Sequence, residues 1–213
     1  MKTPVLITAG ATRNPIDSMR YITANASGRT GIWLAEKLHK TGKFAVHLFG
    51  SPIALMRQKG NYTACEFSST RDLMAKMKGW IEQYPTSIVI HSSAVGDFEI
   101  PSANTGKITS GQHITLSLSP TPKILNQIQQ WSPTVNLVSF KAAAPNTSLS
   151  SLAEIAQRQR VNSKSILVFA NILENTQQDI LLCHAQGEQY FPTRSQALQA
   201  LLDYVTNGTT TVA

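Results

Sequence analysis

The chain has 213 residues, 42% hydrophobic and 15% charged, a composition typical of a folded globular protein and unlike that of a disordered one. Nineteen Lys and Arg against twelve Asp and Glu give a formal net charge of +7, which favours anionic partners. No apolar run approaches the roughly 18–20 residues that span a bilayer, and strand-like sequence starts directly after Met1, so we expect a cytoplasmic protein with no signal peptide and no membrane contact.

Apolar runs alternate with segments of helical periodicity along the chain. In order, the pattern predicts a strand at 5–8, a helix at 29–40, a strand at 44–49, a helix at 70–84, a strand at 87–90, a hairpin with arms at 107–108 and 113–118, a helix at 122–131, a strand at 136–140, a helix at 150–160, a strand at 166–170, an edge hairpin at 180–184 and 189–191, and a helix at 194–205. Thr70 is the expected N-cap of the second helix.

This alternation predicts an α/β, Rossmann-like fold. It has a mostly parallel sheet, helices on both faces and an inserted β-hairpin arm at about 107–118. An ordinary edge ribbon is the other interpretation of that hairpin. At this length, we expect residues 1–213 to form one domain.

Two glycine-containing segments follow the first strand. Gly10 lies in the loop 8–13, and Ser27, Gly28, Arg29 and Gly31 open the first helix. Small residues let the backbone approach a phosphate, and the N–H groups of a helix N-terminus favour an anion. Tight packing of helix on sheet is the alternative reason for these glycines. A dinucleotide site is disfavoured, because GxGxxG does not follow the strand and the second strand ends without Asp or Glu.

The remaining composition excludes other kinds of site. Cys65 and Cys183 are far apart and belong to no CxxC pair, so we expect two buried free thiols. The spacing of Cys and His fits no zinc site. The basic residues are dispersed rather than clustered, so small phosphorylated ligands account for the charge at least as well as nucleic acid, and we expect no nucleic-acid partner.

Six segments, in order, resemble phosphopantothenate–cysteine ligase, the synthetase half of the bifunctional coenzyme A biosynthesis flavoprotein of bacteria. They are 8–31, with TAGATRNPID, RYIT and SGRTG; 93–98, SAVGDF; 106–108, GKI; 122–125, PKIL; 140–142, FKA; and 160–171, with its basic residues and final AN. The order and the length of these segments make chance similarity a poor explanation.

The resemblance implies an amide synthesis. The carboxylate of 4′-phosphopantothenate attacks the α-phosphate of CTP, pyrophosphate leaves, and the amine of L-cysteine then attacks the acyl-cytidylate. Lys side chains, helix N-termini and Mg²⁺ bring the negative charges together. The resemblance also implies a homodimer in which the arm helps to complete the neighbour's site. The flavin-binding half does not precede the ligase segment, so we expect no FMN and, where it exists, a separate phosphopantothenoylcysteine decarboxylase.

The resemblance further implies roles for individual residues. Lys107 and Asn25 are the catalytic candidates, with Lys107 beside the α-phosphate or the acyl-nucleotide. The residues implied in nucleotide binding are Gly10, Ser27, Gly28, Arg29, Gly31, Ser93, Ala94, Asp97, Lys107, Pro122, Lys123, Ile124, Leu125, Phe140, Arg160 and Lys164. Asn25, Ala142 and Asn171 are the candidates for substrate contact. No metal ligand is implied.

Several positions depart from the family pattern. Ala24 occupies the place of the family's functional Asn, with Asn25 one residue later. The other departures are Ala26, Thr109, Ser110, Lys123, Ala143 and Arg160. A CTP-using ligase is the preferred hypothesis, although Lys123 leaves ATP open. The alternatives are a degenerate homologue that binds a nucleotide or phosphate without ligation, an enzyme acting on another nucleotide-linked acid, and nucleic-acid binding suggested by charge alone.

Overall fold

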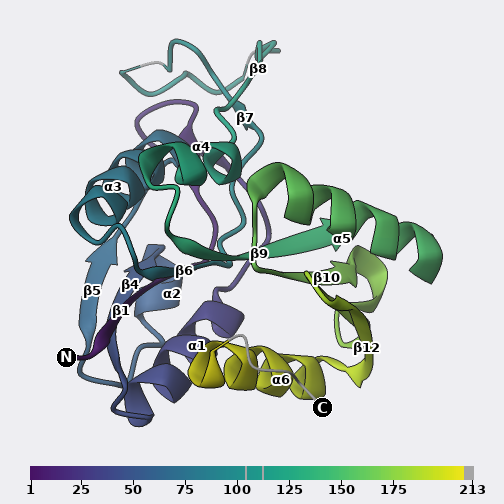
Figure 1. Ribbon diagram of the computed structural model, residues 1–213. Helices are drawn as coiled ribbons and strands as arrows, with labels where there is room; N and C mark the ends of the chain where they lie inside the picture. Colours follow the sequence, from purple (N-terminus) through teal and green to yellow (C-terminus); the bar gives the residue numbers. More distant parts are fainter. Residues whose placement is uncertain (104, 112, 209–213) are drawn as a thin grey trace.

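The computed structural model describes residues 1–103, 105–111 and 113–208. One sheet of eight strands runs in the order β12-β11-β10-β9-β6-β1-β4-β5 (Figure 1). Its strands are β1 (Thr3–Ala9), β4 (Phe44–Gly50), β5 (Thr63–Glu66), β6 (Ile88–His91), β9 (Asn136–Ala143), β10 (Leu167–Ile172), β11 (Gln178–His184) and β12 (Gly187–Thr193). In the order β10-β9-β6-β1-β4-β5, neighbouring strands pair in parallel, although β5 is not among the predicted strands. β11 and β12 add the antiparallel edge hairpin that the sequence predicts.

Helices cover both faces of the sheet. They are α1 (Arg29–Lys40), α2 (Pro52–Leu55), α3 (Thr70–Gln83), α4 (Ile124–Trp131), α5 (Leu149–Ser163), η1 (Leu173–Asn175) and α6 (Arg194–Asn207). Figure 1 shows α1 and α6 on one face and α3, α4 and α5 on the other. Buried apolar clusters lie on both faces, which is why the central strands are continuous apolar runs. The predicted α/β fold is confirmed.

The loops after β1 and β6 meet at the carboxyl edge of the sheet. β1 lies between β4 and β6 in the sheet. The chain goes from β1 to β4 on one side and later comes back to β6 on the other side, so the strand order reverses at β1. Ala94 N donates to Gly10 O at 2.9 Å, and Thr12 N donates to Ala94 O at 3.1 Å. Ligands of open α/β sheets bind at such a switch in strand order.

Two local features differ from the sequence prediction at the start of the chain. Residues 13–23 contain a short hairpin of β2 (Arg13–Pro15) and β3 (Tyr21–Thr23) where no strand is predicted. Ser69, not Thr70, caps α3, since its side chain accepts a hydrogen bond from Asp72 N. The Thr70 hydroxyl instead lies 3.1 Å from the Thr12 hydroxyl.

The arm between β6 and α4 also differs from the prediction. Residues 107–111 and 113–118, where a ladder is expected, contain no strand. The pairing lies at the base of the arm, between β7 (Phe98–Glu99) and β8 (Ser119–Pro120). The alternating Ile114, Leu116 and Leu118 are all exposed, so the period of two belongs to an extended but unpaired segment. No helix in the described residues is long and apolar enough to cross a membrane.

Candidate functional site

A cleft of about 740 Å³ opens between α4 and α5, above the carboxyl ends of β6 and β9. Separate parts of the sequence contribute to it. Its polar and charged lining comprises His91, Ser93, Asp97, Thr121, Lys123, Asn126, Lys141, Arg158, Gln159, Asn162 and Ser163. Apolar contacts come from Val95, Ile124, Leu125, Phe140, Ala142, Ala143, Ala144 and Ile155.

Threonine hydroxyls fix the loop 93–97 that forms one wall of the cleft. Thr12 Oγ1 accepts from Gly96 N at 2.8 Å, and Thr121 Oγ1 donates to Gly96 O at 2.6 Å. Thr8 Oγ1 accepts from Ser93 N at 3.1 Å. Thr8 and Thr12 are completely buried. Because the loop is bonded to the fold on several sides, this wall of the cleft is formed before any ligand arrives.

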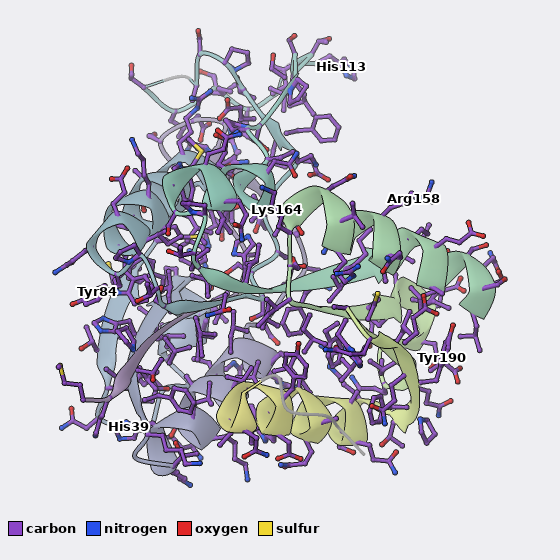
Figure 2. The ribbon with its side chains drawn as sticks, viewed as in Figure 1. His39, Tyr84, His113, Arg158, Lys164 and Tyr190 are labelled. Carbon is purple, nitrogen blue, oxygen red and sulfur yellow. The ribbon has the colours of Figure 1, made fainter. Side chains whose placement is uncertain are left out.

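The rim of the cleft carries more positive than negative charge. Lys123 and Asp97 form an exposed ion pair across the mouth, and Asp97 is the one acidic residue in the lining. Lys141 and Arg158 have no hydrogen bond or ion pair to any described residue. Figure 2 shows Arg158 on α5 directed away from the sheet. Two unpaired cations beside a polar cleft favour an anionic ligand.

The floor of the cleft is polar and uncharged. His91 is 7% exposed, and burial lowers its pKa to about 4, so the imidazole is neutral at pH 7. Its Nδ1 lies 2.9 Å from Thr8 Oγ1. On the α5 side, Gln159 Nε2 donates to Ser139 Oγ at 3.0 Å and to Phe140 O at 3.1 Å.

The glycines of the first loop pack tightly against the protein. Gly10 has φ +93° and Gly28 has φ +74°, a left-handed conformation that favours glycine. A Cβ on Gly31 would lie 2.7 Å from Ala9 Cβ and 2.8 Å from Thr8 O. Packing alone therefore explains Gly31. Gly28, the N-cap of α1, has no side chain, so the first N–H groups of that helix are not capped from it.

A smaller hollow of about 270 Å³ lies on the other side of the paired loops. Its lining includes Arg13, Tyr21, Ala24, Asn25 and Ser51. The guanidinium of Arg13 sits 4.8 Å from the centre of the Tyr21 ring. Ala24 and Asn25 line the same hollow, so the Asn25 amide remains close to the place where the family pattern has its Asn.

Comparisons with known proteins agree with this arrangement. Residues 1–202 match the family model of the DNA/pantothenate metabolism flavoprotein C-terminal domain. The chain belongs to this family. The coenzyme A biosynthesis bifunctional protein CoaBC of Thermococcus kodakarensis is 33% identical over 175 residues, covering 80% of this chain and 41% of that protein. CoaBC of Escherichia coli K12 is 26% identical over 219 residues, covering 94% of this chain and 51% of that protein. The chain thus spans about half or less of these relatives.

A solved structure shows the same fold. The DNA/pantothenate metabolism flavoprotein from Streptococcus pneumoniae matches with a TM-score of 0.84 at 26% identity, covering 96% of this chain and 99% of that chain. The fold and the family assignment of this chain, as a flavoprotein C-terminal domain of pantothenate metabolism, are therefore both established.

Seven of the residues that the family resemblance implies lie in the large cleft: Ser93, Asp97, Lys123, Ile124, Leu125, Phe140 and Ala142. Ala94 and Pro122 are their chain neighbours. The Phe140 ring stacks on Phe169 at 4.9 Å, within the core under α1 and α6, so its side chain faces away from the cleft floor. Asn171 is buried at the end of β10, where its side chain donates to Ile172 O.

Arg160 and Lys164 do not reach this cleft. They line a separate depression of about 390 Å³ with Tyr204 and Gln186. On α5, the residues facing the cleft are 155, 158, 159, 162 and 163, and positions 160, 161 and 164 face elsewhere. The sequence analysis missed Lys141, Arg158, Asn162, His91 and Gln159. The helical spacing of 155, 158, 159 and 162 is the signal that locates three of them.

The implied catalytic Lys107 lies on the arm, exposed, with both neighbours held by the β2–β3 turn. Ile108 N donates to Asp17 Oδ2 at 3.0 Å, and Arg20 donates to Ile108 O from both Nη atoms at 3.2 and 3.3 Å. Ser18 N donates to Gly106 O at 3.3 Å. Asp17 also accepts from Met19 N, and these bonds lower its pKa to about 2. We name this Asp17–Arg20–Ile108 contact the clasp.

Proposed function

We propose that the chain is a phosphopantothenate–cysteine ligase that activates 4′-phosphopantothenate with CTP. The observation that carries this proposal is the cleft, where three family segments, 93–97, 122–125 and 140–142, come together around unpaired cations. Family membership over residues 1–202 supports the same activity. A nucleoside triphosphate is the anionic ligand that a polar floor and a cationic rim suit best.

The proposed reaction has two steps. A carboxylate oxygen of 4′-phosphopantothenate forms a bond to the α-phosphorus of CTP while the bond to the β-phosphate breaks, so pyrophosphate leaves. The amine of L-cysteine then attacks the acyl carbon, the bond to the phosphate breaks, and CMP leaves as the new amide loses a proton. Both steps concentrate negative charge, which Lys141 and Arg158 offset at the rim of the cleft.

Lys107 is proposed to act on the α-phosphate region. Lys107 lines neither the large cleft nor the small hollow of its own chain, because the clasp holds the arm against the β2–β3 turn. A second copy of the chain is therefore the source from which Lys107 would approach a cleft. The exposed Phe98, Ile114, Leu116 and Leu118 of the arm provide an apolar surface for such a homodimer.

Mg²⁺ is proposed to enter as part of the nucleotide substrate. The described residues contain no group of three His, Cys, Asp or Glu side chains that could hold a metal. Mg²⁺ commonly binds through phosphates and waters with one or two carboxylates, and Asp97 is the carboxylate at the mouth of the cleft.

Asn25 is proposed to replace the family Asn that is missing at Ala24. Both residues line the small hollow, which favours an active ligase over a degenerate binding homologue. Asn25→Ala is then expected to reduce ligation while nucleotide affinity in the large cleft is kept.

Pyrophosphate release with CTP, Mg²⁺ and 4′-phosphopantothenate, with and without cysteine, tests the proposal. Cysteine-dependent turnover is expected, and Lys107→Ala should lower it by at least roughly 100-fold. Lys78→Ala, on the exposed surface of α3, is the matched control and should leave turnover unchanged. CTP binding without turnover would overturn the ligase assignment and make the degenerate binding homologue the better one.

A further inference from the structure

The depression of about 390 Å³ that Arg160 and Lys164 line is separate from the large cleft. It lies where α5 ends, β10 begins and β11 turns into β12, with Tyr204 of α6 beside it. The cleft lies above the carboxyl ends of β6 and β9, and no described residue lines both cavities. A ligand in the depression is therefore distinct from the nucleotide proposed for the cleft.

The charge of the depression is entirely positive. Arg160 and Lys164 line it, and among the described residues no Asp or Glu does. Neither cation forms an ion pair with any residue that the structure describes. The rest of the lining is uncharged: Val161, Ser165, Ile166, Ala185, Gln186 and Tyr204. Such a surface attracts an anion.

Attraction to the carboxyl end of α5 is the other reason for cations at this place, because the last carbonyl groups of a helix carry partial negative charge. In α5 these carbonyls already have backbone partners. Ser165 N donates to Arg160 O at 3.0 Å, and Lys164 N donates to Val161 O at 3.3 Å. Within the described chain, the side chains of Arg160 and Lys164 donate to no backbone carbonyl. Both cations thus remain available to a ligand.

Gln157 fixes the guanidinium of Arg160. Gln157 Oε1 accepts from Arg160 Nε at 3.0 Å and from Cys183 Sγ at 3.2 Å. The two Nη atoms of Arg160 have no oxygen partner among the described residues. A planar guanidinium with both Nη atoms available can donate two parallel hydrogen bonds to a phosphate group.

The backbone of Lys164 supports a role for its ammonium group. Lys164 follows the last residue of α5 (Figure 2) and has φ 51° and ψ 36°, a left-handed conformation. Helices most often have Gly at such a position, because a Cβ makes this conformation unfavourable. A lysine at a position that suits Gly is the kind of backbone outlier that points to function.

We propose that the depression is a second binding site, for a phosphate monoester of a small organic molecule. Arg160 and Lys164 bind the phosphate, and the Tyr204 ring with Val161 and Ile166 contacts the organic part. A volume of about 390 Å³ is that of a small-molecule site rather than of a bare ion. This site does not depend on the ligase activity proposed for the cleft.

A ¹H–¹⁵N nuclear magnetic resonance titration with phenyl phosphate tests the proposal, because amide signals report the depression and the cleft separately. Saturable shifts are expected at residues 160–166 and 185–186. Arg160→Gln and Lys164→Gln should each weaken this binding at least about 10-fold. Arg57→Gln removes the same charge from an exposed position outside both cavities and is the matched control. Inorganic phosphate should bind more weakly, since it has no group to contact Tyr204.

Lys164→Gly separates the ammonium group from the backbone. It should weaken phenyl phosphate binding as much as Lys164→Gln does, yet raise the midpoint of thermal unfolding, because Gly suits the left-handed conformation. Lys164→Arg should keep most of the affinity.

Three results would overturn the site: no shifts at residues 160–166, wild-type affinity in Arg160→Gln and Lys164→Gln, or equal weakening by Arg57→Gln. Equal affinity for inorganic phosphate and phenyl phosphate would overturn the assignment of an organic ester. The spectrum of each variant shows whether it is folded.

Discussion

The loop 93–97 and the arm 98–120 follow each other in the chain, but they are held to the fold in different ways. Hydroxyls of Thr8, Thr12 and Thr121 bond the loop from several sides. The arm is held at its base by the two-residue ladder, by Asn14 Nδ2 donating to Phe98 O and by the ion pair of Arg71 with Glu99. Farther along, it is held by the clasp and by the bond between Ser18 and Gly106. The loop is a preformed wall of the cleft, whereas the arm keeps its apolar residues exposed.

Two glycines with nearly the same φ angle test this difference most strongly. Gly10, bonded to the loop, has φ +93°, and Gly111, on the arm, has φ +94°. A Cβ on Gly10 would lie 2.0 Å from Ser51 Oγ, but one on Gly111 would meet nothing within 4 Å. Gly10→Ala should lower the free energy of unfolding by about 3 kcal/mol, from strain and overpacking together.

Gly111→Ala is the matched control, with an expected loss of at most about 1 kcal/mol. Urea denaturation of both variants measures the two values. Equal losses would mean that the arm is as firmly built into the fold as the loop.

Removal of one threonine hydroxyl should loosen the loop. Thr12→Val leaves the partly buried N–H of Gly96 without its acceptor, which should cost about 1 kcal/mol. Unfolding in urea and CTP titration should both show the effect. Thr115→Val, at an exposed position on the arm, should change neither. An unchanged CTP affinity in Thr12→Val would show that the loop does not depend on this bond.

The clasp should make part of the stability depend on acid. The pKa of Asp17 is about 2 in the folded protein and near 3.8 ordinarily, so its contribution is complete above pH 4 and is lost as pH falls toward 2. Asp17→Asn should remove that dependence from thermal unfolding curves between pH 2 and 5. It should also speed trypsin cleavage after Lys107, followed by mass spectrometry. Asp203→Asn, an exposed carboxylate on α6, should do neither.

The smallest effect on stability is expected at the apolar tip of the arm. Ile114→Ser and Leu116→Ser remove exposed side chains, so the free energy of unfolding of the monomer should stay within about 0.5 kcal/mol. The proposed homodimer should nevertheless weaken, as light scattering over a range of concentrations would show. A wild type that is monomeric at micromolar concentration would contradict the proposed role of the arm.

The sequence predicts the main sheet well because burial on both faces makes β1, β4, β6, β9 and β10 continuous apolar runs. The prediction fails where an extended segment has no neighbouring strand to pair with. The alternation at 114–118 has the period of a strand, yet no neighbouring strand pairs with it in the described residues. The hairpin of β2 and β3 is missed for the opposite reason, since three-residue strands carry too little pattern to detect.

The site is predicted only in part, because the position of a residue in a sequence motif does not show which side of a helix its side chain faces. The family resemblance over 160–171 points to Arg160 and Lys164, but a turn of 100° per residue carries Arg160 away from the cleft and brings Arg158 to it. His91 is missed because a buried histidine at the end of a strand usually belongs to the core. Only the structure shows that His91 lines the cleft and that its contact with Thr8 joins two neighbouring strands.

The two edge strands of the sheet, β12 and β5, are built in ways that hinder pairing with strands of other molecules. β12 contains Pro192, which has no N–H to offer another strand, and Glu188, which places charge at the same edge. At the opposite edge, β5 has only four residues. Both edges are poor templates for edge-to-edge aggregation, so a high concentration of this protein should favour a closed assembly through the arm over open-ended fibres.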